Sequence, residues 1–131
     1  MTMYASPEFL DGGFTAFKAN VNKMILLKSY AVSDTYAAVN VTNNLAEIAV
    51  ATGDFTLSGA DGADRIMTST AKNDVTVAAS SGASPNLHIA FVDTVNSKIY
   101  WVTDEASDQV ITAGNKVNFP ALTCTNKQPT V

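Results

Sequence analysis

Residues 91–104 read FVDTVNSKIYWVTD, and this stretch decides the fold class. Two apolar runs flank the polar tetrapeptide TVNS at positions 94–97, and the first run extends back to residue 87. Two β-friendly runs separated by a short polar gap predict a β-hairpin. Because side chains alternate along a strand, Trp101 is expected to face the core together with Ile99, and Tyr100 to face the other way.

The sequence downstream of residue 65 continues the period of two. RIMTSTA and DVTVAAS are expected to be strands joined by a polar turn at 72–74, and residues 109–125 a second hairpin turning at 113–115. Pro120 cannot donate to a ladder, so its strand is expected at an edge or a bulge. Six to eight short strands with regular turns predict a mainly β fold, an antiparallel β-sandwich or a small barrel.

A small α contribution is expected near residues 7–20, packed on the β body. Ser6 is a suitable N-cap, Pro7 occupies the tolerated first position, and Glu8 complements the helix dipole. The glycines at 12 and 13 indicate either a close approach to a sheet or a weak first turn. Apolar residues follow at spacings of four, three, four and three: Leu10, Phe14, Phe17, Val21 and Met24.

The segment between this helix and residue 53 is less clear. KMILLKSY at 23–30 is expected to be a buried strand. Residues 33–50 leave helix and strand open: Ser33 or Asp34 would cap a short helix, whereas VNVT at 39–42 reads as strand.

Length and charge exclude several classes of function. A chain of 131 residues is expected to form a single domain over 1–131, with residues 1–6 an N-terminal arm and 125–131 a C-terminal tail. A net charge of −4, with only 8 Lys and Arg, is the wrong sign for a nucleic-acid or anionic-membrane surface. No apolar run approaches the roughly 20 residues of a membrane span, and no signal-peptide pattern opens the chain, so a cytosolic or cytosol-assembled protein is expected.

Catalytic and metal-binding patterns are weak. His88 and Cys124 are the only residues of their kinds, and no oxyanion-forming motif accompanies them. Asp54, Asp61 and Asp64 lie near glycines, but their spacing does not fit a calcium-binding loop. The sequence therefore predicts a protein that is not an enzyme, without catalytic residues, cofactor, metal or small-molecule substrate; a Cys124–His88 enzyme is the alternative from that class.

Tyrosines are the candidate contact residues, because exposed tyrosine is enriched at protein interfaces. For Tyr100, packing against a neighbouring strand is an equally good interpretation. The candidate protein-contact residues are Tyr4, Tyr30, Tyr36 and Tyr100.

The assembled pattern resembles small virion proteins of tailed bacteriophages, of the head decoration (cement) type. The likeness covers nearly the whole chain as an outline and not as a catalytic signature. The segments that carry it are PEFLDGGFTAFKANVNKMILLKS, SDTYAAVNVTNNLAEIAV, GDFTLSGADGADRIMTSTA, LHIAFVDTVNSKIYWVT and ITAGNKVNFPALT.

This resemblance implies a structural role and supplies no enzymatic residues. It implies that the chain binds the outer surface of the phage head as an oligomer and stabilises the shell. The partners would be the major capsid protein and copies of itself, with no nucleic acid and no membrane. The location would be the virion, on the surface of the phage head, after synthesis in the host cytoplasm. The alternative is a tail, fibre or head–tail connector component that contacts a receptor or a carbohydrate through Tyr30, Tyr36 and Tyr100.

Overall fold

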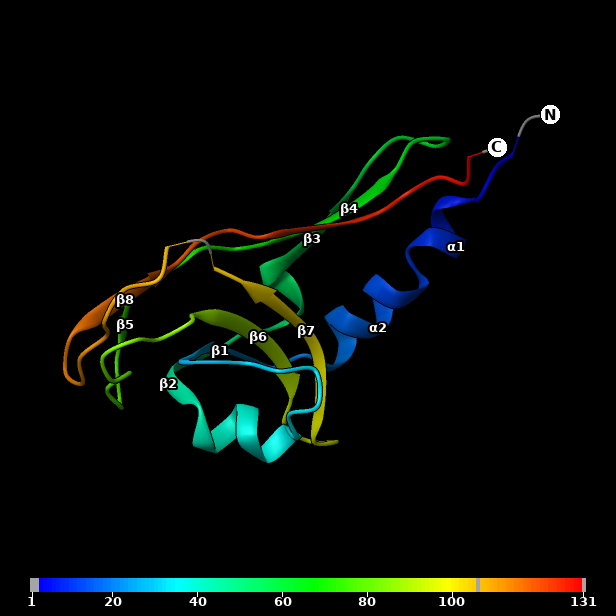
Figure 1. Ribbon diagram of the computed structural model, residues 1–131. Coiled ribbons are helices and arrows are strands. Elements are labelled where there is room, and N and C mark those ends of the chain that lie inside the picture. The colour runs from blue at the N-terminus through cyan, green and yellow to red at the C-terminus, as the bar shows by residue number, and fades with distance from the viewer. Residues whose placement is uncertain (1–2, 106, 131) are drawn as a thin grey trace. The chain divides into compact units, whose positions relative to one another are not determined.

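The computed structural model describes residues 3–105 and 107–130 (Figure 1). It is mainly β, with 36% strand and 18% helix, and every strand pair is antiparallel. The predicted fold class, mainly β with antiparallel sheets and small helices, is confirmed. No helix in the described part of the chain is long and apolar enough to cross a membrane.

The chain forms two compact units that interleave in sequence. Unit 1 contains residues 1–20, 51–71 and 120–131, and unit 2 contains residues 21–50 and 72–119. Neither unit is a continuous piece of chain. The single domain expected over 1–131 stays a prediction, and residues 1, 2 and 131 of the expected arm and tail lie outside the described residues.

Unit 1 consists of short helices and a three-stranded sheet. Two of the helices lie near the N-terminus, and the sheet has the order β3-β4-β9. The elements are α1 (Pro7–Leu10), α2 (Gly12–Asn20), η2 (Thr52–Asp54), β3 (Phe55–Ser58), β4 (Arg65–Ser69) and β9 (Thr123–Asn126).

The expected N-terminal helix is present but interrupted at Asp11. Ser6 is the N-cap, as predicted, and its side chain accepts a hydrogen bond from Phe9 N. Phe17 meets Phe55 of β3 edge to face, with ring centroids 4.9 Å apart, so α2 packs on the sheet of its own unit. A Cβ at either Gly12 or Gly13 would meet nothing within 4 Å, which favours a weak first turn over close approach.

Unit 2 is built on a four-stranded sheet of order β2-β1-β6-β7. Its strands are β1 (Lys23–Leu27), β2 (Asn44–Ala49), β6 (His88–Asp93) and β7 (Lys98–Asp104). Residues 33–50, left open by the sequence, contain both a helix and a strand: η1 (Ala38–Thr42), a π-helical turn, precedes β2. In Figure 1, η1 lies along one face of the sheet, and its Val39 packs in a buried cluster with Ile25, Leu27, Ala90 and Val92.

The 87–104 hairpin forms as predicted, but a bulge alters the faces of its second strand. Val92 pairs with Ile99 while Phe91 pairs with Trp101, so β7 carries one residue more than β6 between these pairs. Trp101 consequently stacks on Phe91, with ring centroids 5.1 Å apart, whereas Ile99 packs against the cluster around Val39. The expectation that Trp101 and Ile99 share a face is wrong, and Trp101 is half-buried.

A second ladder in unit 2 pairs β5 (Lys72–Thr76) with β8 (Lys116–Phe119). Two expectations are therefore wrong. The 72–74 segment is part of β5, where Asp74 has a positive φ, and does not join two neighbouring strands. The 109–125 segment is not a hairpin, because β8 pairs with β5 and β9 pairs with β4. Its turn at Gly114 is present, and β8 ends immediately before Pro120.

Candidate protein-contact surface

Three large apolar side chains lie exposed in the first nine residues. Met3 is 46% exposed, Tyr4 58% and Phe9 79%. We call residues 3–9 the contact segment. Single exposed apolar residues are ordinary on protein surfaces, but three within seven residues make this segment a candidate for a binding surface. The question is therefore what fixes this backbone.

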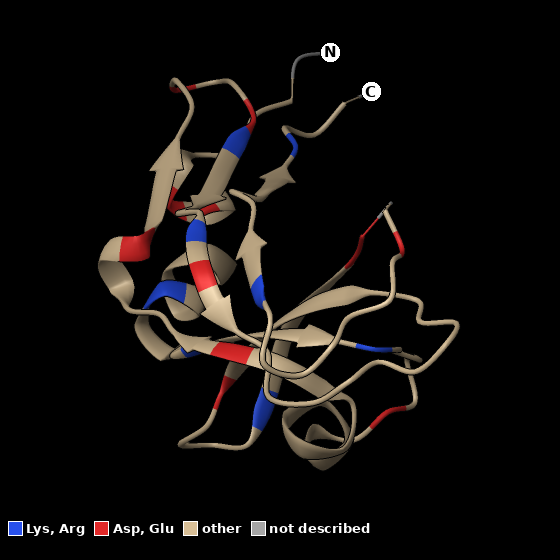
Figure 2. Ribbon diagram, turned by 90° about the vertical axis from the view of Figure 1, so that its left-hand side faces the viewer, with Lys and Arg blue, Asp and Glu red and all other residues tan. Residues whose placement is uncertain are grey.

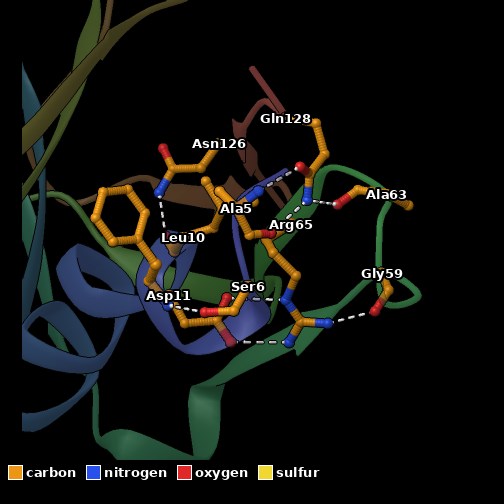
Figure 3. A network of polar contacts seen from close by, with 10 residues as sticks. Ala5, Ser6, Leu10, Asp11, Gly59, Ala63, Arg65, Asn126 and Gln128 are labelled. Carbon is orange, nitrogen blue, oxygen red and sulfur yellow. Dashed lines mark hydrogen bonds and ion pairs between the residues drawn. The ribbon is translucent and has the colours of Figure 1, made fainter. Parts of the chain in front are cut away.

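The helical end of the contact segment is held by a cap and by an ion pair (Figure 3). Ser6 Oγ accepts from Phe9 N at 3.2 Å, and Ser6 O accepts from Leu10 N at 3.0 Å. Asp11, which ends α1, receives two hydrogen bonds of 2.9 Å from the guanidinium of Arg65, and this carboxylate raises the pKa of Arg65. Both side chains are largely buried, and the fork geometry fixes orientation as well as charge.

The extended end of the segment is held by the C-terminal strand region. The side-chain amide of Gln128 binds both backbone groups of Ala5: Gln128 Oε1 accepts a hydrogen bond from Ala5 N at 3.0 Å, and Gln128 Nε2 donates one to Ala5 O at 2.8 Å. Asn126 Nδ2 donates to Leu10 O at 2.8 Å, satisfying a carbonyl at the end of α1. The expected arm and tail therefore hold each other within one chain, and Asn126 belongs to β9 and not to a free tail.

The loop that joins β3 to β4, residues 59–64, connects these contacts. Ala63 N donates to Ala60 O at 3.0 Å with Gly62 at φ +83°, which is the geometry of a type II turn. Gly59 has φ +117°, and a Cβ there would lie 2.2 Å from the carbonyl oxygen of Asp64. Only glycine fits at position 59 without moving the loop.

Three members of the loop also bind neighbouring segments. Gly59 O accepts from Arg65 Nη1, Ala63 O from Gln128 Nε2 at 3.2 Å, and Asp64 Oδ1 from Gln128 N at 2.8 Å. Figure 3 shows the side chains of Arg65 and Gln128 reaching this loop from β4 and from the C-terminal segment. The 59–64 loop thus positions Arg65 and Gln128, and these two side chains hold the backbone of the contact segment in place.

Acidic groups border the exposed apolar side chains. The Tyr4 hydroxyl donates to Asp61 Oδ1 at 2.6 Å, and this hydrogen bond is the main reason that the pKa of Tyr4 is raised. Glu8 is exposed next to Phe9 and contributes to the same shift. Figure 2 shows basic and acidic positions spread along the described chain, with no strand carrying a row of basic residues.

The other candidate tyrosines lie in unit 2 and are half-buried. Tyr30 and Tyr36 pack against the buried cluster around Val39, and the Tyr30 ring lies 5.9 Å from that of His88. Tyr100 lies at the bulge of β7. Of the four tyrosines, Tyr4 is the one that is both exposed and fixed by a described hydrogen bond. Contact roles for all four stay predictions.

The residues weighed for chemistry have structural partners. His88 is buried, its Nδ1 donates to Asn86 O at 2.8 Å, and its Nε2 lies 3.8 Å from Asp104 Oδ1. Cys124 is a half-buried free thiol on β9, in unit 1. Within residues 3–105 and 107–130, no three His, Cys, Asp or Glu side chains are placed to hold a metal ion. Catalysis is neither indicated nor tested by this arrangement.

The three aspartates considered for calcium make contacts within unit 1. Asp61 accepts from Tyr4, and Asp64 accepts from Gln128 N and lies 3.6 Å from Lys127 Nζ. Asp54 Oδ2 accepts from Ala51 N at 2.8 Å at the start of η2. These bonds account for aspartates in glycine-rich loops without a metal.

Comparison with known proteins adds no relative: no family model, curated protein or solved structure matches this chain. The function therefore has to be argued from the surface itself. Sequence reasoning identified Tyr4 but missed Arg65 and Gln128. An arginine directly after a Gly-rich loop and a glutamine near a chain end are weak signals, because neither shows which distant backbone the side chain will reach.

Proposed function

We propose that this chain is a structural virion protein of a tailed phage, of the head decoration type, and that it adheres to the shell through its contact segment. The observation that carries the proposal is the rigid presentation of exposed Met3, Tyr4 and Phe9. The resemblance described for the sequence supplies the virion context, and the rigid apolar segment supplies a means of adhesion.

Rigidity matters because association costs conformational entropy. A segment that is ordered only on binding spends part of its interaction free energy on ordering. The two hydrogen bonds between Gln128 and Ala5, together with the Ser6 cap, already fix this backbone in the free protein. Burial of one large apolar side chain contributes about 1.5–3 kcal/mol, so even a small surface is effective when many copies bind one shell.

The surface also defines the chemistry of its partner. Exposed Glu8 and Asp61 flank the apolar side chains. Two copies that met through this surface would bring like charges together, whereas an apolar hollow with a basic rim would complement it. We therefore assign the contact segment to the major capsid protein, and contacts between copies of this chain to other surfaces.

The test is binding of the purified chain to phage heads that lack it. Wild-type protein should bind in hundreds of copies and raise the temperature at which the heads rupture. Phe9→Ser should weaken binding about tenfold to a hundredfold, since about 1.5–3 kcal/mol of burial is lost. The side chain of Phe9 is 79% exposed, so the variant should fold normally.

Val95→Ser is the matched control, because Val95 is an 81% exposed apolar residue at the hairpin turn of unit 2. It should bind as the wild type does. Equal affinity of Phe9→Ser and wild type would contradict the assignment of the surface. A handful of copies per particle, in place of hundreds, would contradict head decoration and favour the tail or connector alternative.

A further inference from the structure

Unit 2 contains a polar groove that sequence reasoning did not single out. It has a volume of about 330 Å³. That is near the lower limit of small-ligand sites, which are typically about 300–1,000 Å³. We call it the asparagine groove; its lining residues are Lys23, Asn40, Val41, Asn44, Glu47 and Ala78.

The polar side chains of the groove hold one another in place. Lys23 Nζ donates to Asn40 Oδ1 at 3.2 Å and forms an ion pair with Glu47. Asn44 Nδ2 donates to Asn40 O at 2.9 Å. This carbonyl lies in the wide turn of η1, where Asn43 N bonds to Ala38 O five residues back. Widened turns of this kind occur frequently at functional sites.

These bonds determine which way each amide points. An ammonium group only donates, so the oxygen of Asn40 must face Lys23 and its NH2 group must point elsewhere. Asn44 uses its NH2 group on a carbonyl, so its oxygen remains as an acceptor. Among the described residues, neither Asn40 Nδ2 nor Asn44 Oδ1 has a hydrogen-bond partner, and neither is a buried unsatisfied atom. Solvent therefore reaches a fixed donor and a fixed acceptor in one groove.

We propose that the asparagine groove binds adjacent hydroxyl groups of a sugar ring. Each hydroxyl both donates and accepts, so a pair of them matches an amide donor beside an amide acceptor. Lys23 and Glu47 cancel in charge, which gives a charged ligand no net attraction. Lys23 retains one N–H donor, and Glu47 retains its second carboxylate oxygen as an acceptor. Val41, which is 70% exposed, and Ala78 provide an aliphatic surface for the C–H face of a sugar.

This site is independent of the contact segment. It uses residues of unit 2 only, and it differs from the tyrosine-based carbohydrate contact expected from the sequence. The groove contains no aromatic ring, so hydrogen bonding and not stacking provides the recognition, and the site should discriminate between sugars that differ in one hydroxyl orientation.

The experiment is a nitrogen-15 NMR titration of the full chain with glucose, galactose, mannose and N-acetylglucosamine, each to about 100 mM, which covers dissociation constants in the millimolar range. At least one sugar should shift the side-chain NH2 signals of Asn40 and Asn44 saturably. Asn40→Asp removes the donor with almost no change of shape and should weaken that binding about tenfold. Glu47→Gln, which removes the ion pair with Lys23, should also weaken it.

Asn73→Asp is the control: the same substitution at an exposed position of unit 2 outside the groove should leave the binding unchanged. The proposal fails if no sugar moves the Asn40 and Asn44 signals of the wild type. It fails equally if saturable shifts occur only elsewhere, or if Asn40→Asp and Asn73→Asp bind as well as the wild type. The wild-type titration decides the matter even if a variant folds poorly.

Discussion

Replacement of Gly59 by alanine tests whether one loop controls the rigidity of the contact segment. The alanine would have to adopt φ +117°, which costs about 1–3 kcal/mol. Its Cβ would lie 2.2 Å from the Asp64 carbonyl oxygen, and relief of such a contact by backbone movement costs about a further 1–3 kcal/mol. The expected loss is about 2–6 kcal/mol, a large part of the 5–15 kcal/mol that stabilises a typical domain.

Gly62→Ala is the matched control in the same loop. Gly62 also has a positive φ, +83°, but a Cβ there meets nothing within 4 Å. Its cost should be about 1–2 kcal/mol, partly offset by the lower entropy of the unfolded chain. Gly53→Ala, with neither a positive φ nor a close contact, should be neutral or slightly stabilising.

The assay is urea unfolding of the three variants, followed by circular dichroism, together with amide exchange of Ala5. Gly59→Ala should unfold at the lowest urea concentration and should exchange Ala5 N–H faster, because the shifted loop no longer positions Ala63 O and Asp64 for Gln128. If Gly59→Ala and Gly62→Ala lose equal stability, the contact with Asp64 is not what demands glycine. Unchanged exchange at Ala5 would show that the loop does not control the contact segment.

Two further predictions concern single side chains. Gln128→Ala should lower the free energy of unfolding by about 1–2 kcal/mol and speed amide exchange at Ala5, because three side-chain hydrogen bonds are lost. It should also weaken binding to phage heads. Gln109→Ala, at an exposed glutamine, should leave stability, exchange and binding unchanged. The pKa of Asp93 is lowered chiefly by hydrogen bonds from Asn96. The ionised Asp93 therefore stabilises the fold fully above the ordinary carboxyl pKa of about 4, and this stabilisation is lost as the pH falls through the lowered pKa of the folded state. Asp93→Asn should therefore flatten the acid limb of a melting-temperature profile below about pH 4; an unchanged acid limb would show that Asp93 is not the group responsible.

Local signals in the sequence predicted local structure well. The Ser6 cap and the 87–104 hairpin depend on residues near one another in the chain, and both are confirmed. Pairings of β4 with β9 and of β5 with β8 join residues about 40 to 60 positions apart, and no local pattern specifies such partners. The bulge in β7 is likewise invisible to an alternation argument, and it reverses the faces assigned to Trp101 and Ile99.

The candidate sites divide in the same way. Tyr4 was predictable from residue type, whereas its partner Asp61 lies 57 residues away. The asparagine groove had a weaker signal: Asn40 and Asn44 are four residues apart, but Asn40 lies in η1 and Asn44 begins β2, so their spacing alone does not show that they meet. What the sequence could not provide was the position of Lys23 on the neighbouring strand, which orients the Asn40 amide.

The last strand, β9, has a consequence for biosynthesis. It completes the β3-β4-β9 sheet, and Gln128 follows it to bracket Ala5, 123 positions earlier. During vectorial translation the nascent chain exposes β3, β4 and the N-terminal helices long before their final partner leaves the ribosome. Unit 1 therefore matures only after β9 has left the ribosome, whereas the 87–104 hairpin of unit 2 has all of its own residues available earlier.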